Sequence, residues 1–252
     1  MSAATLRLLR PLRFGPATEV WLARLGRREV VARRHAAPPG SPFPPPADPA
    51  VLAALRHPGI ERFLASRVDE DGVVTHVFVR LRGRTLAEAG VPDAAALAAW
   101  LRDAALALRW MHERSPAAPR LHGDVSPGNV FVTEDGRARL IDLAATRPGL
   151  HPAGPDVIWG TLPYLAPEIL AGGPCTAASD VWSLAATAVS VALGRLPWAG
   201  ARSPHEVLAE MHASPAAGLA TATGPAARDV VAAMLHPDPA RRPTAERVCR
   251  AL

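Results

Sequence analysis

The sequence has 252 residues, of which 49% are hydrophobic, enough to bury one sizeable core and too many for a disordered chain. The net charge is +5 with arginine and no lysine, but the arginines are scattered and no nucleic-acid-binding motif is present, so we expect no nucleic acid partner. The apolar run 181–193 is too short for a membrane span, the N-terminus lacks a secretion signal, and Cys175 and Cys249 form no disulfide framework, which predicts a cytoplasmic protein.

The N-terminal part of the chain predicts a small sheet. Apolar and polar residues alternate in the ranges 5–9, 19–24 and 29–33, a pattern that is typical of strands. Arg33 and Arg34 stand where the third strand ends. From the residues alone, they are either solvated surface side chains or cations placed to bind an anionic ligand.

A proline-rich segment, residues 38–49, follows these strands. Its prolines predict an extended linker, and docking of a partner protein is the alternative interpretation. At its end, Asp48 and Pro49 are typical of a helix start, an N-cap residue followed by proline at the first helical position. We therefore expect a helix after Asp48.

A second hairpin and a long helix are predicted next. The ranges 61–68 and 73–79 have strand patterns and are joined by the turn 69–72. Between residues 93 and 114 apolar residues recur at helical spacing, which predicts a core helix. These residues are Leu97, Leu101, Ala104, Leu108 and Met111.

The most informative stretch is residues 122–129, which read HGDVSPGN. Asn129 follows Asp124 closely, and a hairpin of the strands 130–132 and 139–141 is predicted to bring Asp142 back beside them. Phosphoryl transfer needs one carboxylate to take the proton of the nucleophile and other oxygen ligands to hold Mg²⁺. Asp124 fits the first role, and Asn129 and Asp142 fit the second.

Four further motifs follow in the second half of the chain. They are GTLPYLAPE at 160–168, SDVWSL at 179–184, GRLPW at 194–198 and DPARRPT at 238–244. Together with residues 122–142, they resemble in the same order the catalytic loop, the DFG segment and the large-lobe motifs of the protein kinase superfamily.

The resemblance implies an α+β, bilobal protein-kinase-like fold for residues 1–252. A small lobe of antiparallel strands with one helix is expected at about 1–80, a hinge at about 79–83, and a large, mainly α-helical lobe at about 84–252. It also implies that Arg242 pairs with Glu168 across the large lobe and that Asp180 supports the catalytic loop.

The resemblance also implies a function, with ATP and Mg²⁺ as cofactors and a Ser or Thr hydroxyl of a protein substrate as the phosphate acceptor. The resemblance implies that Asp124 is the catalytic base, with Ser126 and Asn129 in the same loop. Asn129 and Asp142 are expected to hold the metal. Thr161 is expected to form a hydrogen bond with Asp124. The expected nucleotide-binding residues are Gly15, Val20, Arg33, Arg34, Asp48, Phe78, Val79, Leu81 and Phe131.

Several positions depart from the family pattern. The phosphate-covering loop keeps only Gly15, and an arginine, Arg33 or Arg34 depending on the alignment, replaces the strand lysine. Asp48 occupies the place of the glutamate that pairs with this lysine, and Ser126 replaces the lysine of the catalytic loop. A pseudokinase that acts as a nucleotide-binding, scaffold or regulatory module is therefore the alternative function.

A third reading rests on residues 122–124 and 127–129. HGD followed by PGN also resembles small-molecule kinases of the aminoglycoside phosphotransferase type. The APE sequence at 166–168 and Arg242 favour the protein kinase over this reading.

Overall fold

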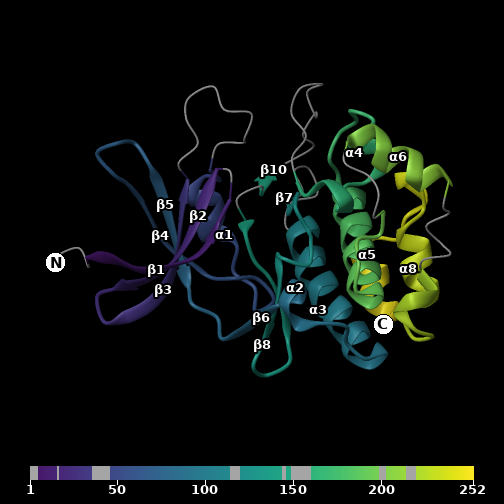
Figure 1. Cartoon of the computed structure of the whole chain (residues 1–252), viewed down its shortest axis with the longest axis horizontal. Coiled ribbons are helices and arrows are strands. Elements are labelled where there is room, and N and C mark those ends of the chain that lie inside the picture. Colours follow the sequence, from purple (N-terminus) through teal and green to yellow (C-terminus); the bar gives the residue numbers. More distant parts are fainter. Residues whose placement is uncertain are drawn as a thin grey trace.

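The computed structural model describes residues 5–15, 17–35, 46–113, 120–143, 146–148, 160–198, 203–213 and 220–252. A strand-rich N-terminal part and a helical C-terminal part lie beside each other along the longest axis of the molecule (Figure 1). The predicted α+β class with a sheet lobe and a helical lobe is confirmed. Most of the proline-rich segment 38–49, for which partner docking was an expectation, lies outside the described residues.

The N-terminal sheet has five antiparallel strands in the order β1-β2-β3-β5-β4. Because side chains alternate along a strand, Arg33 and Arg34 point to opposite faces of this sheet. One face carries a small apolar cluster, and the other contributes Phe78 to the main core. The strands are β1 (Leu6–Phe14), β2 (Thr18–Leu25), β3 (Arg28–His35), β4 (Phe63–Val68) and β5 (Val74–Val79).

Helix α1 (Pro49–Ala54) packs beside this sheet and is short. Asp48 is its N-cap, and the Asp48 carboxylate accepts the N–H of Ala50 at 2.7 Å. The predicted helix start is therefore confirmed. Leu52 and Leu55 are almost fully buried, so hydrophobic contacts fix α1 on the core.

The C-terminal part is built around α5 (Ala177–Leu193), which packs against α3 (Ala94–Glu113). Every residue from 179 to 191 is buried, polar ones such as Asp180 included, so α5 is enclosed on all sides. Thr176 caps its start by accepting the N–H of Ala178 at 3.2 Å, and Gly194 ends it with a left-handed φ of 63°. The surrounding elements are α2 (Leu86–Ala89), β7 (Arg120–Leu121), β10 (Arg147–Pro148), η2 (Leu162–Tyr164), α4 (Pro167–Leu170), α6 (Pro204–Ala213), η3 (Ala220–Thr223), α8 (Arg228–Met234), η4 (Pro239–Arg241) and α9 (Ala245–Ala251).

A three-stranded sheet lies between the two parts, with β6 (Gly83–Thr85), β8 (Val130–Thr133) and β9 (Ala138–Leu140) in the order β6-β8-β9. The backbone of residues 59–61 pairs with β9. The N–H of Leu140 donates to the carbonyl oxygen of Gly59 at 2.8 Å, and the N–H of Glu61 donates to that of Leu140 at 2.9 Å. This pairing places Glu61 beside Asp142.

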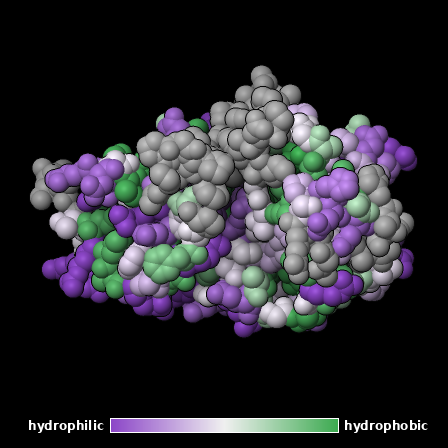
Figure 2. Space-filling view, turned by 45° about the horizontal axis from the view of Figure 1, so that its top comes forward, coloured by the Kyte–Doolittle hydropathy of each residue, from purple (hydrophilic) through white to green (hydrophobic). Residues whose placement is uncertain are grey.

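Among the described residues, no helix combines the length and the hydropathy that crossing a bilayer requires. Hydrophobic and hydrophilic residues are mixed over the face shown in Figure 2. The exposed large hydrophobic residues of the described chain lie on different elements and loops, namely Leu12, Phe14, Val68, Val91 and Leu196.

Candidate active site

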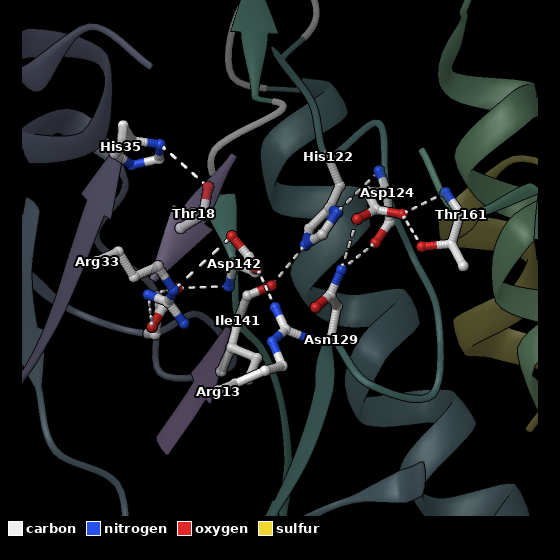
Figure 3. Close-up of polar contacts among 11 residues, drawn as sticks. Arg13, Thr18, Arg33, His35, His122, Asp124, Asn129, Ile141, Asp142 and Thr161 are labelled. Carbon is white, nitrogen blue, oxygen red and sulfur yellow. Dashed lines mark hydrogen bonds and ion pairs between the residues drawn. The ribbon is translucent and has the colours of Figure 1, made fainter. Parts of the chain in front are cut away.

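The loop between β7 and β8 fixes Asp124 through both carboxylate oxygens (Figure 3). Nδ2 of Asn129 donates to Oδ2 of Asp124 at 2.8 Å and to its carbonyl oxygen at 2.9 Å. The N–H and the hydroxyl of Thr161 donate to Oδ1 at 2.8 and 2.7 Å, so the expected contact between Thr161 and Asp124 is present. Burial raises the pKa of Asp124 above its usual value, although the Thr161 hydroxyl opposes the rise. A positioned carboxylate with a raised pKa suits a proton acceptor.

Asp180, on α5, supports the backbone of this loop. Its two oxygens accept the N–H groups of His122 and Gly123 at 2.8 and 2.9 Å. Nε2 of His112, on α3, lies 2.9 Å from Oδ2 of the same carboxylate. Burial acts to raise the pKa of Asp180, but the hydrogen bond and the charge of His112 outweigh it, so the pKa is lowered. The supporting role expected for Asp180 agrees with these contacts.

The His122 side chain joins the catalytic loop to the hairpin that precedes Asp142. Its Nδ1 accepts the N–H of Asp124 at 3.3 Å, and its Nε2 donates to the carbonyl oxygen of Ile141 at 3.1 Å. The ring is fully buried. A rigid side chain thus fixes the segments that carry Asp124 and Asp142 relative to each other.

Asp142 has a left-handed backbone conformation, with φ at 62°. Its N–H donates to Oε1 of Glu61 at 2.5 Å, which compensates for the strain of this conformation in a non-glycine residue. Oδ2 accepts from Nη2 of Arg13 at 2.9 Å, and Oδ1 is 3.7 Å from Nε of Arg33. Burial works to raise the pKa of Asp142, but the charges of Arg33 and Arg13 keep it below its usual value. Asp142 is therefore an ionised carboxylate.

Arg33 and Glu61 form a buried ion pair next to Asp142. Nη1 of Arg33 lies 2.8 Å from each oxygen of Glu61, and the two side chains are only 5% and 4% exposed. The guanidinium also lies over the ring of Phe78, 4.6 Å from its centroid. Burial lowers the pKa of Arg33, but the charges of Glu61 and Asp142 more than compensate, so the guanidinium stays protonated.

The structure decides between the two arginines and corrects the pairing expected for Asp48. Arg33 is the cation at the site, whereas Arg34 contacts Glu19 at 2.9 Å and Asp69 at 3.5 Å on the other face of the sheet. Asp48 is exposed and caps α1. The acid that pairs with Arg33 is Glu61, because the backbone pairing with β9 brings Glu61, and not the start of α1, to the guanidinium.

The residues expected to line a nucleotide site are placed unevenly. Val20 lies opposite Arg33 in the β2–β3 register, and Phe78 is on the same face of the sheet. The N–H of Gly15 donates to the carbonyl oxygen of Thr18 at 2.8 Å, and the N–H of Val79 donates to that of Arg62 at 2.8 Å, so neither amide is free for a ligand. Among the other expected residues, Leu81 and Phe131 are half-buried and Ser126 is buried.

Comparison with family models decides the assignment that the motifs and this geometry indicate. The model of the protein kinase domain matches residues 48–251, which is most of the chain. The chain belongs to the protein kinase domain family. Of the departures from the family pattern, Asp48 falls at the start of the matched residues, whereas the phosphate-covering loop and β3 precede them.

Curated relatives agree with this assignment. The inactive serine/threonine-protein kinase PLK5 of Mus musculus is 32% identical over 212 residues, covering 77% of this chain and 32% of that protein. Serine/threonine-protein kinases drp72 of Corynebacterium efficiens is 30% identical over 169 residues, 64% of this chain and 31% of that protein. The DNA damage-responsive serine/threonine-protein kinase RqkA of Deinococcus radiodurans is 34% identical over 155 residues, covering 59% of this chain and 23% of that protein. The matches with these relatives span about a third or less of their length.

The large lobe of this kinase domain contains the expected ion pair between Arg242 and Glu168. It is bidentate, with both N–O distances at 2.7 Å, and the Arg242 side chain is fully buried. The guanidinium lies 4.9 Å from the ring centroid of Trp182, which stacks on Trp198. The Arg242 guanidinium also donates to the carbonyl oxygens of His236, Pro237 and Ala178, so the pair connects segments of the helical part, and we expect it to have a structural role.

Asn129 and Asp142 have donor atoms that fit Mg²⁺, which prefers oxygen ligands. Oδ1 of Asn129 is buried and has no hydrogen-bond partner. Such an atom is costly in a folded protein unless a ligand satisfies it. Among the described residues, no group of three or more His, Cys, Asp or Glu side chains forms a metal site. Asn129 and Asp142 would therefore hold Mg²⁺ together with phosphate oxygens and water.

Sequence reasoning did not find two residues of this site, Glu61 and Arg13. Glu61 could have been noticed as an acid that directly follows the apolar Ile60 and precedes a strand. Arg13 gave no signal, because its contact with Asp142 joins residues that are far apart in the sequence and no local pattern encodes it.

Proposed function

We propose that this kinase domain transfers the γ-phosphate of ATP, with Mg²⁺, to a serine or threonine hydroxyl of a protein. The observation that supports it most strongly is that Asp124, Asn129 and Asp142 lie near one another (Figure 3) and that the buried Oδ1 of Asn129 lacks a hydrogen-bond partner. His122 fixes the segments that carry these residues, and Asp142 is ionised.

Each residue has a defined task in the reaction. Asp124 accepts the proton of the attacking hydroxyl while the bond from that oxygen to the γ-phosphorus forms and the bond to the β-phosphate oxygen breaks. Thr161 and Asn129 hold the carboxylate of Asp124 in one orientation. Mg²⁺ supplies positive charge for the phosphate oxygens, and Asn129 and Asp142 would bind it. Arg33 holds a positive charge at the same cleft, anchored by Glu61.

The test is phosphate transfer from γ-labelled ATP to the purified domain itself and to a mixture of serine- and threonine-containing acceptor proteins. We expect acid-stable label on serine or threonine, and a loss of about a hundredfold or more for Asp124→Asn, the general range for removal of a catalytic base. Asp135→Asn is the matched control, since Asp135 is an exposed turn residue. Equal activity of Asp124→Asn and wild type would contradict the assignment of the base.

The second candidate function is a pseudokinase that binds nucleotide or a partner without transfer. Three observations favour it. The guanidinium of Arg33 is engaged by Glu61, and the N–H of Gly15 is engaged by Thr18. One of its relatives is named an inactive kinase. Saturable binding of ATP without label on any acceptor would favour this candidate over the enzyme.

A further inference from the structure

Arg13 reaches from the end of β1 into the catalytic cleft. Its Nη2 donates to Oδ2 of Asp142 at 2.9 Å (Figure 3). A Cβ atom added to Gly128 would lie 3.6 Å from Nη1 of Arg13, so the guanidinium also lies next to the catalytic loop. The side chain therefore spans from the sheet to the residues that flank Asn129.

The loop after β1 offers few backbone donors for phosphates. The N–H of Gly15 donates to the carbonyl oxygen of Thr18, and Pro16 has no N–H. In the catalytic loop, Ser126 brings no positive charge. Backbone amides that would bind phosphate are thus scarce, and Arg13 is a cationic donor at the same place.

The two arginines that contact Asp142 differ in their freedom to move. The Arg33 side chain is 5% exposed and committed to Glu61, whereas the Arg13 side chain is 54% exposed and pairs with Asp142 alone among the described residues. An exposed ion pair contributes little to stability, while opening a buried pair is costly. Arg13 can therefore exchange its partner, and Arg33 stays in place.

We propose that Arg13 is a phosphate-binding residue that exchanges Asp142 for the phosphates of a bound nucleoside triphosphate. A guanidinium matches two phosphate oxygens through parallel hydrogen bonds. Its departure frees Oδ2 of Asp142, the residue that the proposed function requires for Mg²⁺. The side chain of Arg13 thus takes over the task of the missing loop amides. This inference rests on the proposed function only in requiring that the nucleotide binds in this cleft.

The test is the affinity of ligands that differ in their phosphates. Dissociation constants of ATP, ADP and adenosine are measured with Mg²⁺ by calorimetry for wild type, Arg13→Gln and Arg13→Lys. We expect Arg13→Gln to weaken ATP binding by about tenfold to hundredfold, to leave adenosine unchanged, and Arg13→Lys to recover part of the loss. Arg10→Gln is the matched control, because Arg10 is exposed on the same strand.

The outcomes separate this inference from the proposed function. If wild type binds ATP and Arg13→Gln binds it equally well or more tightly, Arg13 is not a phosphate ligand, and the proposed function stands. If wild type does not bind ATP, both are wrong. Melting temperatures without ligand show whether the variants fold, and we expect Arg13→Gln to melt close to wild type, because the Arg13 side chain is 54% exposed and Asp142 keeps Arg33 nearby.

Discussion

Replacing Glu61 by glutamine should destabilise the whole domain, because it leaves the charge of Arg33 buried without its main partner. The two side chains are 5% and 4% exposed, and the remaining acid, Asp142, is 3.7 Å away from Arg33. Removing one partner of a buried ion pair costs about 3–5 kcal/mol. Glutamine keeps an oxygen that can accept the N–H of Asp142, so we expect about 3 kcal/mol, the lower end. In a domain of this size, such a loss lowers the melting temperature by about 6–12 °C.

The assay is urea unfolding followed by tryptophan fluorescence, with Asp48→Asn as the matched control. Asparagine caps a helix as well as aspartate does, so this control should unfold like wild type. The double variant Arg33→Met with Glu61→Met should lose much less unfolding free energy than the two single variants lose together. Apolar side chains can replace a buried ion pair at little cost. Equal losses for Glu61→Gln and Asp48→Asn, or additive losses in the double variant, would refute the assignment of Glu61 as the partner.

Three further predictions concern other parts of the domain. Arg242→Met should lower the free energy of unfolding by about 3–5 kcal/mol, because it leaves Glu168 unpaired; a loss under about 1 kcal/mol in urea unfolding would contradict a structural role. Gly72→Ala should lower the free energy of unfolding by about 1–2 kcal/mol because of the positive φ at this position, since nothing lies within 4 Å of the added Cβ. Gly83→Ala should have a far lower melting temperature, because its Cβ would lie 2.0 Å from a carbonyl oxygen of β8. Burial raises the pKa of Cys175 to about 12, so at pH 8 its alkylation by iodoacetamide should be much slower in the native protein than in urea; equal rates would show an accessible thiolate.

The sequence predicted the helical part of the domain well because its signals are local. Apolar residues recur at helical spacing between residues 93 and 114, and α3 occupies this range. The pair of Arg242 and Glu168 was implied by the resemblance to the protein kinase superfamily, and the structure contains it. The strands and the turn before Asp142 followed from alternation and turn residues.

The partner of Arg33 was not predictable in the same way. Counting along the chain assigned Asp48 to this role, but α1 has six residues and begins directly after Asp48. The carboxylate of Asp48 therefore caps the N-terminus of α1 and does not pair with Arg33. The position of Glu61 depends on the pairing of residues 59–61 with β9, a contact across a long stretch of sequence that no local pattern encodes.

Because Glu61 and not Asp48 pairs with Arg33, the strands rather than α1 determine the geometry around Asp142. Glu61 is fixed by a backbone hydrogen bond to Leu140, two residues before Asp142, and its carboxylate binds both Arg33 and the N–H of Asp142. The cation, the acid and the expected metal ligand therefore form one unit held by strand backbone, and α1 contributes no side chain to the ion pairs described for it. This unit is buried, whereas Arg13, the second cation that contacts Asp142, is 54% exposed, so the proposed exchange of partners by Arg13 would leave the unit intact.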